Sequence, residues 1–139
     1  MSNYRIITDS ACDLPGDMLQ NLQVDRVSLT VLFRGENRTD SVDEGIREFY
    51  DGLRSGDVAT TSAVNPDGWA SAMEPALQAG QDVLVLAFSS GLSTTYQSAV
   101  IAANELMEQY PGCKIYVVDT RCASLGQGLL VWYACRKRD

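Results

Sequence analysis

The chain of 139 residues contains no histidine. Histidine is the side chain that most often serves as a general base and that activates serine or cysteine nucleophiles, so its absence disfavours most hydrolytic chemistry. The four cysteines form no C-x-x-C pair, which signals neither a zinc site nor a disulfide framework. We therefore expect reduced structural thiols, no metal and no cofactor.

Basic residues and long apolar runs are also scarce. The net charge of −7 disfavours binding to nucleic acid or to an anionic membrane surface. No apolar stretch approaches the roughly 20 residues of a membrane helix, so we expect no stable membrane insertion and a cytoplasmic location. Hydrophobic residues make up 45% and charged residues 21% of the chain, which is typical of one globular domain.

The apolar pattern alternates between strand and helix signals. Residues 4–8 read as a short strand and residues 24–33 as one alternating strand near a sheet edge. The segments 83–88 and 115–118 are continuous apolar runs typical of central strands covered on both faces. Helical spacing follows a cap or a proline in most intervening segments, at 15–22, 46–53, 66–77, 96–110 and 125–138. Together these segments predict a three-layer α/β/α fold with a mostly parallel central sheet.

Three local features add expectations of detail. Residues 35–38 have the composition of a polar turn, and Ser41 and Asp43 are candidate caps for the helix that begins near residue 46. Pro75 lies inside a helical pattern, where it removes a backbone hydrogen bond, so we expect a kink or an early end near Glu74.

Hydroxyl and acidic side chains follow three of the predicted strands, in the segments 8–10, 89–95 and 119–120. The carboxyl ends of parallel strands share one sheet edge, so we expect the binding site there. Ser93, Thr94 and Thr95 also precede a long helix, whose free N–H groups and positive dipole end suit an anion. Residues 60–62 form a second hydroxyl cluster before another helix, and the two clusters could hold one carboxylate between them.

Alternative interpretations remain open for these residues. Serine and threonine before a helix are commonly only N-caps. Asp9 and Asp119 could be metal ligands or general bases of a phosphoryl- or glycosyl-transfer enzyme, although aspartates at strand ends more often accept hydrogen bonds from nearby loops. A truncated domain without activity is a third interpretation. Residues 126–128, Gly-Gln-Gly, lack the lysine of a phosphate loop, and we expect close helix packing there.

Four sequence blocks resemble, in order, those of the DegV family. They are residues 8–15 (TDSACDLP), Thr61-Ser62 with Pro66, residues 89–99 (SSGLSTTYQSA), and Asp119-Thr120 followed by residues 123–128 (ASLGQG). The resemblance implies a bacterial protein of two domains that binds a fatty acid in a tunnel between them. Residues 1–139 would be the N-terminal lipid-binding α/β domain, with the family's C-terminal domain absent.

The resemblance also implies roles for individual residues. The positions carried over are Thr61, Ser62 and Ser93, which would hold the fatty-acid carboxylate. From their place in the hydroxyl-rich and acidic loops, we expect Thr94 to join them and Asp9, Ser10, Ser90 and Asp119 to support the edge of the site. Because the family is similar to the acyl-binding subunits of fatty-acid kinases, the chain would be a binding protein and a separate kinase would do the chemistry. Thr94 departs from the glycine usual in the family. The surface that the absent domain would cover, with an apolar patch beside Ser93, could support self-association.

Overall fold

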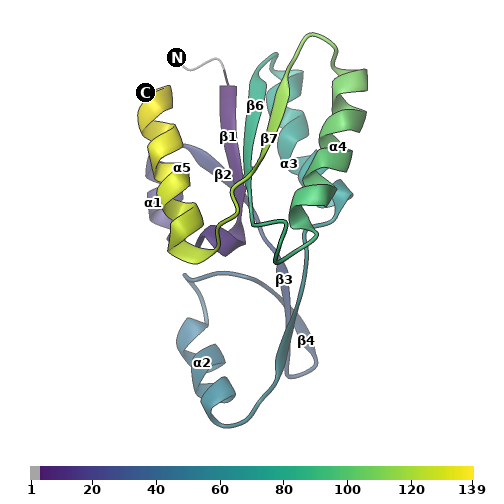
Figure 1. Ribbon diagram of the computed structural model, residues 1–139. Helices are drawn as coiled ribbons and strands as arrows, with labels where there is room; N and C mark the ends of the chain where they lie inside the picture. Colours follow the sequence, from purple (N-terminus) through teal and green to yellow (C-terminus); the bar gives the residue numbers. More distant parts are fainter. Residues whose placement is uncertain (1–3) are drawn as a thin grey trace.

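The computed structural model describes residues 4–139 and shows two lobes (Figure 1). The upper lobe is built on a parallel sheet with strand order β2-β1-β6-β7, and the lower lobe on an antiparallel sheet with order β4-β3-β5. The parallel strands are β1 (Tyr4–Asp9), β2 (Val24–Val27), β6 (Asp82–Ala87) and β7 (Ile115–Asp119). The antiparallel strands are β3 (Thr30–Phe33), β4 (Glu36–Thr39) and β5 (Ala59–Ser62).

Helices cover both faces of the parallel sheet, so the predicted three-layer architecture is confirmed (Figure 1). One face carries α3 (Pro66–Gln78) and α4 (Thr95–Gln109), and the other carries α1 (Gly16–Asn21) and α5 (Ser124–Arg138). Each interface has its own apolar core, the first centred on buried Trp69 and Met73 and the second on Ile6 and Val131. A short 3-10 helix, η1 (Ser10–Cys12), follows β1, and α2 (Ile46–Arg54) belongs to the lower lobe.

The single strand predicted over residues 24–33 is wrong, because the chain changes sheets within it. Pairing of β2 with β1 ends at Val27 opposite Asp9, and the chain enters the lower sheet at Thr30. The buried hydroxyl of Ser10 accepts the Leu29 N–H at 2.9 Å, which fixes the crossing point. The predicted turn at 35–38 is also only partly right, because Glu36 begins β4, whose polar residues suit an exposed edge strand.

Two further expectations need correction. Strand β7 is an edge strand rather than a central one, and it leaves Tyr116 61% and Val118 40% exposed on its uncovered face. Of the two outcomes expected at Pro75, the early end is wrong, because helix α3 continues past Glu74 to Gln78. Ala76 and Leu77 are buried after the proline, and this packing offsets a cost of about 3 kcal/mol for an interior proline.

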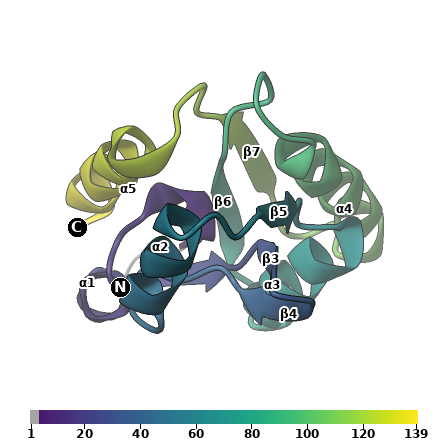
Figure 2. The same ribbon diagram turned by 90° about the horizontal axis from the view of Figure 1, so that it is seen from below.

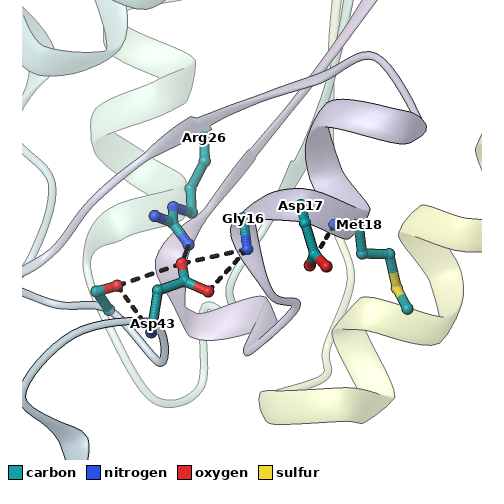
Figure 3. A network of polar contacts seen from close by, with 6 residues as sticks. Gly16, Asp17, Met18, Arg26 and Asp43 are labelled. Carbon is teal, nitrogen blue, oxygen red and sulfur yellow. Dashed lines mark hydrogen bonds and ion pairs between the residues drawn. The ribbon is translucent and has the colours of Figure 1, made fainter.

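Asp43 joins the lobes instead of capping α2. Gly45 occupies the N-cap position of α2, without a side-chain cap. The Asp43 carboxylate instead accepts the N–H of Gly16, at the start of α1, at 3.0 and 3.1 Å, and Arg26 of β2 donates to it at 3.4 Å (Figure 3). The Gly16 bond, more than any other cause, holds the pKa of Asp43 below its ordinary value. The loop before α2 is therefore fastened to two elements of the upper lobe.

Candidate functional site

The carboxyl ends of β1, β6 and β7 lie at one edge of the parallel sheet, as the sequence predicted, and this edge faces the lower lobe (Figures 1 and 2). The strand order places β1 beside β6, and the crossover from β1 runs to β2 on one side whereas the crossover from β6 runs to β7 on the other side. In open α/β sheets this switch point is where ligands bind. The hydroxyl-rich loop from β6 to α4 emerges at this point.

Ser93 and Thr95 form a hydrogen-bonded unit at the start of α4. The Ser93 hydroxyl oxygen accepts the Thr95 N–H at 3.1 Å and lies 2.8 Å from the Thr95 hydroxyl oxygen. Thr94 is the N-cap residue of α4, but its side chain makes no cap hydrogen bond and the residue is exposed. The Thr95 N–H is engaged by Ser93, whereas the next N–H groups of the first turn have no acceptor within the helix.

The second hydroxyl cluster is tied to the first through Thr95. The buried hydroxyl of Thr95 accepts the Val64 N–H at 3.3 Å. Val64 follows Ser62 by two residues, as Thr95 follows Ser93. Trp69 of α3 donates its indole N–H to the Thr95 carbonyl at 3.0 Å, which anchors the junction in the core. The structure therefore brings the two clusters together. Thr61 and Ser62 lie on β5, not in a loop, and are exposed.

Asp9 is fully buried and holds three segments together. One carboxylate oxygen accepts the N–H of Ala11 and the side-chain amide of Gln127, each at 3.1 Å, and the other accepts the N–H of Phe88 at 2.7 Å. Burial raises the pKa of Asp9 in spite of these bonds. Asp9 thus lies behind the site, where it joins the ends of β1 and β6 to α5. The Gln127 side chain is buried, and its carbonyl oxygen has no partner within residues 4–139.

The remaining predicted edge residues are also engaged within the protein. Ser10 accepts the Leu29 N–H, as described above. Ser90 donates its hydroxyl to one oxygen of Asp119, and the other oxygen accepts the N–H groups of Ser90 and Arg121 at 3.1 Å. The Ser90 hydroxyl is the main reason that the pKa of Asp119 lies below its ordinary value. Asp119 therefore joins the loops that follow β6 and β7.

A groove of about 330 Å³ lies between the lobes. Its apolar wall comes mainly from the lower lobe and α5, and its polar rim carries more acidic than basic groups. The apolar residues are Val31, Val42, Ile46, Phe49, Tyr50 and Leu125, and the charged ones are Asp13, Arg38, Asp40 and Glu44. Sequence analysis missed this groove, although the helical spacing of Ile46, Phe49 and Tyr50 could have indicated it.

The strand register relates this groove to Thr61. Residues directly opposite each other in a sheet project to the same face, and Val31 is opposite both Thr61 and Arg38. Val31 and Arg38 line the groove, so Thr61 lies on the groove side of β5. Thr60 and Ser62 alternate to the other side, but Ser62 is in register, through Thr30, with Thr39, which also lines the groove.

Apolar side chains are exposed beside the site and along α5. Leu92, next to Ser93, is 67% exposed, and the wider apolar patch expected there stays a prediction. Helix α5 also exposes Leu125, Leu129, Trp132 and Tyr133 on its outer side. Self-association through these surfaces stays a prediction. Across residues 4–139, no helix combines the length and the apolar character that crossing a membrane requires.

The chain is similar in sequence to proteins of one known family. The family model described as "Uncharacterised protein, DegV family" matches residues 3–139. A DegV domain-containing protein from Clostridium perfringens is 43% identical over 142 residues, which cover 100% of this chain and 49% of that protein. The chain thus spans about half the length of the curated relatives it matches.

Two solved structures are similar over nearly the whole chain. A DegV family protein from Thermus thermophilus, described for its fatty acid binding, is 37% identical with a TM-score of 0.84, covering 98% of this chain and 47% of its own. The Fatty Acid Kinase (Fak) B3 protein from Streptococcus pneumoniae, loaded with linoleic acid, is 25% identical with a TM-score of 0.80, covering 98% and 48%. By sequence and by fold, the chain belongs to the DegV family.

Proposed function

We propose that this chain binds a long-chain fatty acid, with the carboxylate at the hydroxyl groups of Ser93, Thr94, Thr61 and Ser62 and the alkyl chain in the groove between the lobes. The observation that carries the proposal is the hydrogen bond from Val64 N–H to Thr95, which joins the two hydroxyl clusters. The fatty acids of the Thermus thermophilus and Streptococcus pneumoniae relatives support the choice of ligand.

The donors at the site suit a carboxylate. The exposed N-cap of α4 offers backbone N–H groups and the positive end of a 15-residue helix. The Thr94 hydroxyl makes no cap hydrogen bond, so it is available to a ligand. Thr61 adds a hydroxyl from the groove side of β5. Hydrogen bonds to a charged acceptor contribute about 1.5–3 kcal/mol each, so a few such donors suffice to orient the head group.

The groove suits an alkyl chain and disfavours the carboxylate. Apolar side chains form its wall, and each buried methylene group contributes about 0.8 kcal/mol. Asp13, Asp40 and Glu44 outnumber Arg38 on its rim and would repel an anionic head group. Charge and polarity therefore orient the ligand with its carboxylate toward Thr61 and α4.

The chain would bind the fatty acid without converting it, and it would do so in the cytoplasm. Asp9 and Asp119, the residues of the enzyme alternative, are engaged in hydrogen bonds that join structural elements, which supports a binding protein rather than a catalyst. We propose that a separate kinase acts on the bound acid, as the similarity to the Streptococcus pneumoniae protein suggests. The proposed location is the cytoplasm, and the four free cysteines, typical of a reducing compartment, support it.

A titration with oleate tests the proposal, with oleyl alcohol as the ligand that lacks the carboxylate. It uses the 139-residue chain and, in parallel, the chain joined to the half of the Thermus thermophilus relative that it does not match. Oleate should bind in at least one of these forms and more tightly than the alcohol. Removing two hydroxyl groups by Ser93→Ala with Thr61→Ala should weaken oleate binding at least tenfold, about 1.4 kcal/mol.

Thr60→Ala is the matched control, because it removes a hydroxyl from the same strand at a position whose register partners, Leu32 and Asn37, do not line the groove. Its affinity for oleate should equal that of the wild type. Thermal unfolding of every variant checks that the fold is intact. No oleate binding in either form, or equal affinity of the wild type and the folded double variant, would overturn the proposal.

A further inference from the structure

We infer that Thr95 is a positioning residue, whose buried hydroxyl directs the proton of Ser93 outward to the ligand. This inference rests on the proposed function, because it concerns how Ser93 donates to a carboxylate. Thr95 is fully buried and cannot itself contact a ligand from solvent. Its hydroxyl oxygen is 2.8 Å from that of Ser93, and either oxygen could be the donor from distance alone.

The donors and acceptors around Thr95 determine which of the two hydroxyl groups donates the hydrogen bond. The Thr95 hydroxyl already accepts the Val64 N–H at 3.3 Å, and its own proton needs an acceptor in a site closed to water. Among residues 4–139, the Ser93 oxygen is the acceptor within hydrogen-bond distance of that hydroxyl. If Ser93 donated instead, the Thr95 proton would be buried without a partner, which is the costlier arrangement. Thr95 is therefore the donor and Ser93 the acceptor.

These hydrogen bonds leave the hydroxyl proton of Ser93 available to a ligand. Its oxygen accepts two hydrogen bonds, from the Thr95 hydroxyl and from the Thr95 N–H at 3.1 Å. A hydroxyl oxygen has two acceptor positions, so both are filled, and the O–H bond must point away from Thr95. Ser93 is half-buried, so this proton reaches the open side of the loop. The chain of donors runs from Val64 N–H through Thr95 and Ser93 to the ligand.

The surrounding contacts hold Thr95 in the required position. Its carbonyl accepts the indole N–H of Trp69 at 3.0 Å, and Trp69 is fully buried between α3 and the sheet. The Val64 bond fixes the side chain from the β5 side. A ligand therefore meets a Ser93 hydroxyl that is already oriented, which lowers the entropy lost on binding.

Thr95→Val tests the inference, because valine keeps the branched shape and removes the hydroxyl. The test uses both forms of the protein described above. Thr95→Val should weaken oleate binding at least fivefold and oleyl alcohol binding less, and Thr95→Ser, which restores the hydroxyl, should bind within twofold of the wild type. In the Ser93→Ala background, Thr95→Val should change oleate affinity less than twofold, because Thr95 acts through Ser93.

An equal loss from Thr95→Val in both backgrounds would show a purely structural role and overturn the inference. An unchanged affinity of folded Thr95→Val would do the same. If Thr95→Val does not fold, a loss of affinity in Thr95→Ser as large as that in Ser93→Ala overturns the inference and retained affinity supports it. If Ser93→Ala alone has no effect, the proposed function fails as well, whereas a loss in Ser93→Ala with none in Thr95→Val rejects only the role of Thr95.

Discussion

Substitution of Asp9 tests whether this aspartate has a structural or a catalytic role. Its carboxylate accepts three hydrogen bonds in a fully buried position, from Ala11, Phe88 and Gln127. Asp9→Asn keeps one oxygen and replaces the other with an amide donor, so at least one buried donor loses its acceptor. Asp9→Ala leaves the two backbone donors, Ala11 N–H and Phe88 N–H, without an acceptor.

The magnitudes follow from the cost of an unpaired buried group, about 1–3 kcal/mol. We expect Asp9→Asn to lower the free energy of unfolding by about 2 kcal/mol and Asp9→Ala by about 4 kcal/mol. Asp25→Asn is the control, because Asp25 pairs with Arg5 on a half-exposed edge and should contribute no more than about 1 kcal/mol. Urea unfolding followed by tryptophan fluorescence measures all three, since Trp69 is fully buried.

The pH dependence of the free energy of unfolding also tests the role of Asp9. Burial raises the folded-state pKa of Asp9 above its value in the unfolded chain. Its titration therefore favours folding most below the unfolded pKa, and this contribution is lost as pH rises through the folded pKa. The stability gap between wild type and Asp9→Asn should shrink as pH rises from about 4 toward neutral. A gain of stability in Asp9→Asn at pH 7 would refute this account and would favour the strained, functional aspartate of an enzyme.

Two other substitutions test the lobe contact and the α5 packing. Asp43→Asn should destabilise the protein at pH 7. Because the folded-state pKa of Asp43 is lowered, the stability that its carboxylate contributes is lost as pH falls through that pKa. The urea unfolding curves of wild type and variant should therefore converge below pH 3.8, and a constant difference in stability would contradict the role given to Asp43. Gly128→Ala would place a Cβ 2.8 Å from the Cys12 carbonyl oxygen and should cost about 1–3 kcal/mol in thermal unfolding. Its control, Gly126→Ala, meets only the Cys122 Cβ at 3.7 Å and should gain about 0.5–1 kcal/mol, so equal melting temperatures would count against close packing at Gly128.

The parts of the fold that the sequence predicted are those with buried, periodic side chains. Strand β6 and helices α3 and α4 each bury an apolar face, and a buried face leaves a clear pattern. Strands β4 and β5 escaped prediction, because most of their residues are polar and exposed and only pairing with β3 makes them strands. The continuous apolar run of β7 was misleading for the opposite reason, since Tyr116 and Val118 are apolar but exposed.

Some contacts of the candidate site were predictable from the sequence and others were not. Adjacent parallel strands made the meeting of the β6 and β7 loops predictable, and Ser90 with Asp119 confirms it. The junction of Val64 with Thr95 was not predictable, because it depends on how the lower lobe returns to the upper one. Asp43 shows the limit most clearly. A carboxylate three residues before α2 looked like its cap, but it accepts the N–H of Gly16 at the start of α1 instead.

Native mass spectrometry of the chain purified from bacterial cells tests the central claim most directly, because it detects a bound lipid by its mass. The measurement includes the 139-residue chain, the same chain joined to the unmatched half of the Thermus thermophilus relative, and the Ser93→Ala, Thr61→Ala variant of each. We predict that a wild-type form carries the mass of one long-chain fatty acid and that its double variant carries much less. Wild-type forms that carry no fatty acid, and acquire none from added oleate, would contradict the account.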